Sequence, residues 1–217
     1  MNKLIIFDWD GTIVDSTSHI VQSINKACST LYKQTFEEKK IKSVIGLSLP
    51  IAFKNLTGLE SQAEFNEFAD LYKKLYIIER PRPFDGVVLG FDRLKKNNFT
   101  LAVATGKSRR GLDNDFTAYD LGKYFSDSKT ADECFSKPHP QMIEEIYTNL
   151  MFDRTSVTMV GDSLMDQNMA KNAHVSFVGV NYGASSPGDF DDYGRFFADS
   201  PVDLFDWLLN NASVNYF

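Results

Sequence analysis

The chain has 217 residues, of which 43% are hydrophobic and 24% are charged, a composition typical of a soluble globular protein. It carries 23 lysines and arginines against 29 aspartates and glutamates, and this net charge of −6 argues against nucleic acid as a partner. Two cysteines are too few for a disulfide framework, and no apolar run is long enough for a signal peptide or a membrane-spanning helix. We therefore expect a cytoplasmic protein that does not bind membranes.

Four short apolar runs, each about as long as a β-strand, predict the strands of a parallel sheet. They lie at residues 4–7, 101–104, 157–160 and 175–180. Stretches with helical periodicity lie between them, so we expect an α/β fold with a doubly wound parallel sheet. Ligands of such sheets bind beyond the carboxyl ends of the strands, which directs attention to the residues that follow each run.

The region from residue 16 to residue 82 has a different pattern. Apolar residues recur at helical spacing within residues 20–31 and 65–76, and no strand-like run interrupts them. We predict an all-helical domain over residues 16–82, inserted into a catalytic core that comprises residues 1–15 and 83–217. The aromatic residues of 65–76 are expected to belong to the core of this insertion.

Two pairs of carboxylates follow predicted strands. Asp8 and Asp10, in residues 8–12 (DWDGT), permit three interpretations: a turn stabilised by aspartate, a magnesium site, or a nucleophile beside an acid–base group. Asp162 and Asp166 are four residues apart and would share one face of a helix that begins there. That second pair fits either metal ligation or the acidic first turn of a capped helix.

A hydroxyl group and a lysine complete the set of candidates. Thr105 and Gly106 follow the second run, where a hydroxyl and an amide can bind phosphate or cap a helix. Lys137 precedes a proline that restricts its backbone to extended conformations, and its ammonium group can bind a phosphate oxygen or lie in a solvated loop. Residues 107–110 (KSRR) are expected to form a solvated helix face, from which Lys107 can reach the mouth of the site.

In this order and spacing the four groups resemble the motifs of the haloacid dehalogenase superfamily, and the insertion resembles the helical cap of its phosphoglycolate phosphatase-like branch. The resemblance implies a Rossmann-like core and a Mg²⁺-dependent phosphatase that acts through an aspartyl phosphate on a small metabolite similar to phosphoglycolate. It also implies that Asp8 is the nucleophile and Asp10 the acid–base residue. The implied phosphate ligands are Thr105, Gly106 and Lys137, and the implied metal ligands are Asp8, the backbone carbonyl of Asp10, and Asp162, with Asp166 in support.

Two alternatives to a phosphatase stay open. A phosphosugar mutase would use the same acid, but the helical mutases of this branch carry an arginine in a cap loop, and residues 45–50 (IGLSLP) contain none. A non-catalytic phosphate-binding module would not need Asp10. Trp9 departs from the family pattern, in which a smaller aliphatic residue is commoner. The oligomeric state is left as monomer or homodimer, and the cations that could hold a carboxylated substrate are Lys42, Lys54, Arg80 and Arg82.

Overall fold

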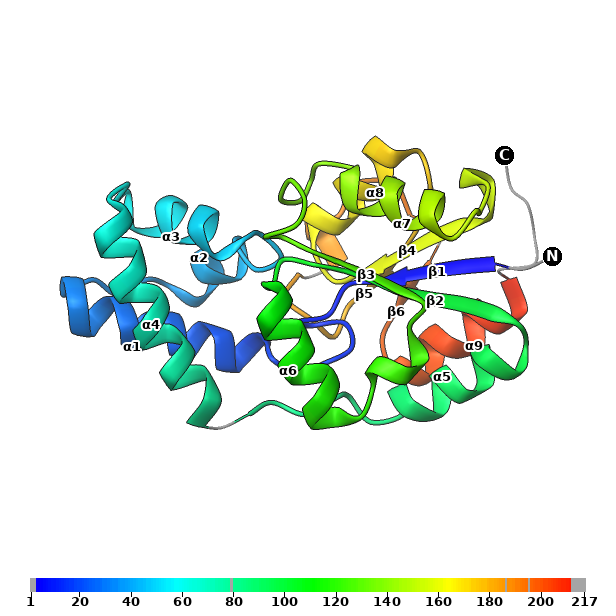
Figure 1. Ribbon diagram of the computed structural model, residues 1–217, viewed down its shortest axis with the longest axis horizontal. Coiled ribbons are helices and arrows are strands. Elements are labelled where there is room, and N and C mark those ends of the chain that lie inside the picture. Colours follow the sequence, from blue (N-terminus) through cyan, green and yellow to red (C-terminus); the bar gives the residue numbers. More distant parts are fainter. Residues whose placement is uncertain (1–2, 79, 186, 195, 212–217) are drawn as a thin grey trace.

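The computed structural model of the protein describes residues 3–78, 80–185, 187–194 and 196–211. Six strands form one sheet in the order β3-β2-β1-β4-β5-β6, and each neighbouring pair is parallel (Figure 1). The four apolar runs are confirmed as strands, and two further strands lie at the edges. The strands are β1 (Lys3–Phe7), β2 (Phe99–Thr105), β3 (Asp127–Thr130), β4 (Val157–Gly161), β5 (Ser176–Val180) and β6 (Phe197–Ala198).

Helices cover both faces of the sheet. Ile5 and Phe7 of β1 pack into a cluster with helices α5, α6 and α9, whereas Leu4 and Ile6 pack with α7 and α8 on the opposite face. Successive side chains of a strand point to opposite faces, so a strand covered on both sides must be apolar throughout. The helices of this part are α5 (Val87–Lys96), α6 (Arg109–Tyr119), α7 (Gln141–Asn149), α8 (Leu164–Ala173) and α9 (Pro201–Asn211), with 3₁₀ turns at Gly122–Tyr124, Arg154–Ser156 and Pro187–Asp189.

Four helices between β1 and α5 form a separate group with a hydrophobic cluster of its own, which includes Ile24, Cys28, Phe53 and Phe68. Figure 1 shows this group beyond the end of the sheet toward which β1 runs. The predicted all-helical insertion is therefore present, and we call it the cap; its boundaries at residues 16 and 82 stay a prediction. Its helices are α1 (Thr17–Tyr32), α2 (Glu38–Lys42), α3 (Leu49–Thr57) and α4 (Gln62–Ile78).

The two segments that join the cap to the sheet lie side by side. The backbone amide of Asp15 donates to the carbonyl of Arg82 at 2.9 Å, and that of Phe84 donates to the carbonyl of Ile13 at 3.0 Å. An antiparallel bridge between residues 14 and 83 joins them as well. The cap is therefore attached through a short paired connection and not through two independent linkers.

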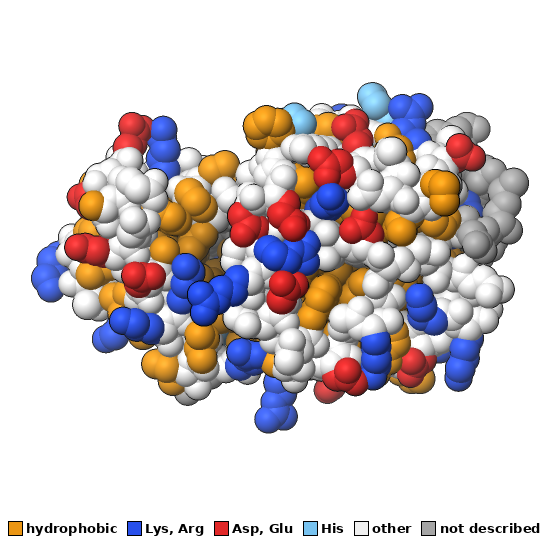
Figure 2. Space-filling model, viewed as in Figure 1, with side chains coloured by type: hydrophobic (Ala, Val, Ile, Leu, Met, Phe, Trp, Pro, Cys, Tyr) orange, Lys and Arg blue, Asp and Glu red, His pale blue; other side chains and the backbone are white. Residues whose placement is uncertain are grey.

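Charges of both signs occur on the surface. Figure 2 shows acidic and basic side chains next to one another near the middle of this face. Some form exposed ion pairs, such as that between Arg109 and Glu133 at 2.7 Å. No helix within the described ranges is long and apolar enough to cross a membrane.

Candidate active site

Residues from several strand ends meet at one edge of the sheet. Strand β1 lies between β2 and β4, so Asp8 after β1 is flanked by Thr105 at the end of β2 and by Asp162 after β4. Lys137 reaches the same edge from the loop that follows β3, and Asp166 reaches it from the first turn of α8. The topology thus gathers the predicted site residues from widely separated parts of the chain.

Asp8, Asp162 and Asp166 form a buried cluster of carboxylates. One oxygen of each lies within 4.8 Å of the others, and all three residues are at most 1% exposed. The Nζ of Lys137 lies 2.5 Å from Asp8 Oδ1 and 2.6 Å from Asp166 Oδ1. Three carboxylates therefore face one ammonium group, which leaves excess negative charge in a place that water screens poorly.

Burial, together with this excess charge, changes the protonation behaviour of the cluster. Burial raises the pKa of Asp8 well above its usual 3.8, with Asp166 and Asp162 adding to the rise and Lys137 opposing it. Burial, followed by the charge of Asp166, raises the pKa of Asp162 to about 7. Burial alone would lower the pKa of Lys137, but the attraction of Asp166 and Asp8 outweighs it and raises that pKa. Protons, or a positive ion in their place, are therefore held strongly by this cluster.

The cluster fits a divalent cation in both chemistry and charge. Carboxylate oxygens are the ligands that Mg²⁺ prefers, and it is commonly bound by one or two carboxylates together with phosphate oxygens. When ionised, the three carboxylates carry two more charges than the ammonium group that faces them among the described residues, and a divalent ion would neutralise this excess. The three aspartates are thus the residues able to hold a metal here.

The carboxylate of Asp162 is enclosed by backbone that only glycine permits. Gly11 has a φ of +80°, and a Cβ on it would lie 2.1 Å from Asp162 Oδ2. The Thr12 hydroxyl donates to Oδ1 at 3.3 Å and the Ala184 amide donates to Oδ2 at 2.6 Å. Gly11 is therefore needed so that its loop can approach Asp162.

Asp166 caps a helix and also belongs to the carboxylate cluster. Its Oδ2 accepts a hydrogen bond from the Ser163 amide at 3.1 Å, while the Asp166 amide donates to the Ser163 hydroxyl at 3.3 Å. This reciprocal arrangement caps the start of α8. Its other oxygen bonds to Lys137, so the helix cap also orients a member of the cluster.

Thr105 and Gly106 lie beside the cluster at the end of β2. Thr105 is 1% exposed, and its hydroxyl oxygen accepts a hydrogen bond from the backbone amide of Lys107 at 3.2 Å. Phosphate binding by these two residues stays a prediction.

A loop of the cap lies directly on the site. A Cβ on Gly106 would come within 2.5 Å of the Gly46 carbonyl oxygen and 2.6 Å of that of Leu47. The Ser48 amide donates to the Ser136 hydroxyl at 2.9 Å, next to the lysine of the third motif. The cap is therefore in a closed position, with its loop against Gly106 and Ser136.

The carboxylate of Asp10 lies apart from the other acids. Its Oδ1 accepts hydrogen bonds from the Ser16 hydroxyl at 2.8 Å, from Lys107 Nζ at 3.2 Å and from the Tyr76 hydroxyl at 3.4 Å. It is not a member of the carboxylate cluster. The resemblance implies that Asp10 contributes its backbone carbonyl to the metal, and not its carboxylate, and this role of Asp10 stays a prediction.

Lys107 and Tyr76 lie beside Asp10. Lys107, expected to reach the mouth of the site from a solvated helix face, has a side chain only 12% exposed and contacts Asp10. Tyr76 packs against the hydrophobic cluster of the cap, as expected, and also places its hydroxyl against the same carboxylate. These contacts join residues 97 and 66 positions apart, so no local spacing could have indicated them.

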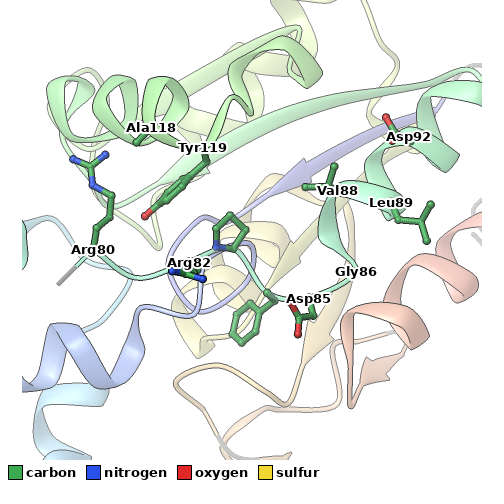
Figure 3. A pocket seen from close by; sticks show the side chains of 11 residues that line it. Arg80, Arg82, Asp85, Gly86, Val88, Leu89, Asp92, Ala118 and Tyr119 are labelled. Atoms are coloured by element: carbon green, nitrogen blue, oxygen red, sulfur yellow. The ribbon is translucent and has the colours of Figure 1, made fainter.

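The cationic candidates for substrate binding make their contacts elsewhere. Lys42 and Lys54 form ion pairs with acids of the cap, each at 2.7 Å. Arg80 and Arg82 line an open groove of about 840 Å³ beside α5 and α6, which Figure 3 shows together with Tyr119. For the described residues, no hydrogen bond or ion pair joins these four cations to the carboxylate cluster.

Proteins that are similar to this chain include hydrolases and phosphatases. Residues 5–180 match the family model of the haloacid dehalogenase-like hydrolases. The chain is 34% identical over 190 residues to a Dickeya dadantii protein named probable phosphatase IndB (84% of this chain, 83% of that one). It is 29% identical over 201 residues to a phosphoglycolate phosphatase of Agrobacterium fabrum (84% and 82%). In fold it is similar to a hydrolase from Pseudomonas syringae, with a TM-score of 0.87 at 20% identity (97% and 99%).

Proposed function

Because the chain belongs to the haloacid dehalogenase-like hydrolases and is a hydrolase of phosphate esters, we propose that it is a Mg²⁺-dependent phosphatase with Asp8 as its nucleophile. Its substrate would be a small phosphorylated metabolite similar to phosphoglycolate. The alcohol would be released while an aspartyl phosphate forms, and water would then free the phosphate.

One observation carries the proposal: the two aspartates of the first motif have different surroundings. Asp8 lies in the charged cluster that fits a metal, and Asp10 lies outside it with its carboxylate hydrogen-bonded to Ser16 and Lys107. Nucleophilic attack needs a carboxylate that can face the phosphorus atom, whereas proton transfer needs a second carboxyl group near the leaving oxygen. The separation of the two carboxylates supports Asp8 as the nucleophile and Asp10 as the acid–base residue.

In the first half-reaction an oxygen of Asp8 forms a bond to phosphorus, and the bond from phosphorus to the alcohol oxygen breaks. Asp10 donates its proton to that oxygen. In the second half-reaction Asp10 takes a proton from water, the resulting hydroxide attacks phosphorus, and Asp8 leaves. Throughout, Lys137, Thr105 and Gly106 would bind phosphate oxygens, so that most of the rate enhancement comes from positioning and charge neutralisation.

Mg²⁺, held by Asp8, Asp162 and the backbone carbonyl of Asp10 with Asp166 in support, would supply positive charge beside the phosphate. The contact of the cap loop with Gly106 supports a small substrate, because a cap packed against the site would exclude bulk water and limit the size of the alcohol.

Two lines of support favour a phosphatase similar to phosphoglycolate phosphatase over a mutase. A relative from Agrobacterium fabrum has that name, as does one from Colwellia psychrerythraea that is 27% identical over 212 residues (88% of this chain, 90% of that one). The cap loop at residues 45–50, which lies on the site, contains no arginine to hold a second phosphate. We also propose a cytoplasmic location, since Cys28 and Cys134 are free thiols, as is usual in reducing compartments.

The test is turnover of p-nitrophenyl phosphate by the wild type and by Asp8→Asn, each with Mg²⁺ and with EDTA. We expect activity only in the wild type with Mg²⁺, and a loss of at least about 1000-fold in the variant because its amide cannot attack phosphorus. Asp113→Asn is the matched control, since Asp113 is an exposed acid paired with Arg109 on α6. Equal activity in Asp8→Asn and the wild type would exclude Asp8 as the nucleophile.

A further inference from the structure

Lys107 is a buried cation between two acids at the boundary of the cap and the sheet. Its Nζ lies 3.2 Å from Asp10 Oδ1 and 3.2 Å from Asp115 Oδ2, and these two acids are 13% and 4% exposed at their side chains. Burial acts to lower the pKa of Lys107, but Asp10, Tyr76 and Asp115 together raise it well above its usual value. The ammonium group is therefore charged at physiological pH and is fixed on both sides.

Asp115 is held in place from within the core of the sheet domain. The indole Nε1 of Trp9 donates to Asp115 Oδ2 at 3.0 Å. Trp9 itself is fully buried, with its ring 5.3 Å from that of Phe116 and 6.1 Å from that of Phe125, both in edge-on contact. Trp9 lies between Asp8 and Asp10 in the chain, so the same turn that carries both aspartates also anchors the partner of Lys107.

The cap supplies the remaining contact of Lys107. Its Nζ donates to the Tyr76 hydroxyl at 3.3 Å and lies 4.6 Å from the centre of the Tyr76 ring. The backbone carbonyl of Tyr76 is in turn hydrogen-bonded to the His19 ring at 2.8 Å. Lys107 is thus in contact with the sheet domain through Asp115, with the cap through Tyr76, and with the acid–base residue itself.

We propose that Lys107 is a positioning residue for Asp10, and that Asp115 and Trp9 position Lys107 in turn. This inference rests on the proposed function, in which Asp10 gives its proton to the leaving oxygen. A carboxyl group transfers a proton efficiently only from a narrow range of orientations, and Lys107 and Ser16 together hold Oδ1 of Asp10. Because Lys107 acts through Asp10, its loss should affect only reactions that depend on proton transfer from Asp10.

Esters with different leaving groups provide the test. p-Nitrophenolate is stable as an anion and needs little protonation, whereas an alkoxide such as that of glycerol phosphate needs a proton as it leaves. The ratio kcat/KM reports the first half-reaction and is measured with saturating Mg²⁺. For Lys107→Met we expect a fall of about 100-fold with glycerol phosphate and of less than about 5-fold with p-nitrophenyl phosphate.

A variant of a residue that contacts Lys107 should show the same difference between the two esters, but a smaller one. Asp115→Asn keeps an acceptor for Trp9 but loses the charge that faces Lys107, and we expect a fall of about 10-fold with glycerol phosphate alone. Lys107→Met combined with Asp10→Asn should lose little beyond Asp10→Asn, because both act on one proton transfer. Lys123→Met is the matched control, since Lys123 is an exposed lysine of the sheet domain paired with Asp120 and should leave both esters unaffected.

The outcomes separate the inference from the proposed function. Equal losses with the two esters, in Lys107→Met or in Asp115→Asn, would overturn the positioning role and assign Lys107 to the fold or to phosphate binding. If Lys107→Met does not fold, Asp115→Asn decides the question by the same ratio. A wild type without activity on either ester in Mg²⁺ would overturn the proposed function and this inference together.

Discussion

The carboxylate of Asp8 lies against two other buried acids and one lysine, whereas that of Asp10, two residues further on, accepts hydrogen bonds from a serine, a lysine and a tyrosine. Around Asp8 the acids outnumber the described cations by three to one. Around Asp10 the ratio is two to one, because Asp115 is the second acid beside Lys107. Each region therefore has negative charge in excess, but the excess is larger around Asp8.

The turn that contains Asp8 and Asp10 therefore provides two different chemical environments. A large buried excess of negative charge is costly unless a cation enters, so the Asp8 region depends on something outside the chain. The carboxylate of Asp10 is held by hydrogen bonds and an ion pair of the chain itself. Trp9, between them, points into the hydrophobic core.

The largest expected effect comes from removing a charge on the Asp8 side. Asp162→Asn should lower kcat by about 1000-fold, since neutralisation of phosphate charge by a metal is worth several kcal/mol. Titration calorimetry should show that its Mg²⁺ affinity falls at least about 100-fold, because a direct ligand is lost and losses of second-shell groups already cost 10–100-fold. Unchanged Mg²⁺ affinity would contradict the assignment of this cluster to the metal.

Removing the charge on the Asp10 side should have a smaller and different effect. Asp10→Asn is expected to lower kcat by about 100- to 1000-fold, the usual contribution of a general acid–base group. Its Mg²⁺ affinity should stay within about 3-fold of the wild type, because the proposed ligand is the backbone carbonyl. A loss of Mg²⁺ affinity in calorimetry as large as that of Asp162→Asn would remove the distinction between the two regions.

Without metal, the stability of the protein should depend on pH because of the excess of buried carboxylates. The pKa of Asp162 rises from its usual 3.8 to about 7 on folding, so the folded state binds protons more tightly than the unfolded chain between these values. This group therefore stabilises the fold most below about pH 4, and the contribution is lost as pH rises toward 7 and above. Thermal melts in EDTA should show the loss as a fall in Tm relative to Asp162→Asn.

Mg²⁺ should reverse that loss where the carboxylates are ionised. At pH 8 and a concentration about 100 times Kd, binding should raise Tm by roughly 5–10 °C for a chain of this size. The gain should be smaller at pH 5.5, since protons compete for the same oxygens. The same increase in Asp162→Asn would show that the ion binds elsewhere.

The smallest effect concerns the cap loop that lies against Gly106. Gly106→Ala would place a Cβ within 2.5 Å of the Gly46 carbonyl oxygen, so the loop must move outward. We expect KM to rise about 3- to 10-fold with little change in kcat, since uniform binding is weakened while the acids keep their places. Gly188→Ala, with no atom near its Cβ, is the control. Steady-state kinetics that show no change in KM for Gly106→Ala would contradict a closed loop during turnover.

Much of the fold could be predicted because the central strands are covered on both faces. Coverage on two sides requires continuous apolar runs, and these identified β1, β2, β4 and β5. Strands β3 and β6 were not predicted, because each lies at an edge of the sheet with one neighbour. The sequence of β3 is polar (DSKT), and β6 has only two residues, so neither has the pattern of a buried strand.

The α/β class, the helical insertion and the order of the acidic, hydroxyl and lysine groups could be predicted without a structure, because each depends on local pattern and on position after a strand. That Asp8, Asp162, Asp166 and Lys137 meet followed from the rule that the carboxyl ends of parallel strands share one edge. The surroundings of Asp10 could not be predicted in this way. The contact of Trp9 with Asp115 joins positions 106 apart, and that of Lys107 with Asp10 joins positions 97 apart. Such contacts arise from the packing of helices against the sheet and of the cap against both, and no periodicity within one segment encodes them.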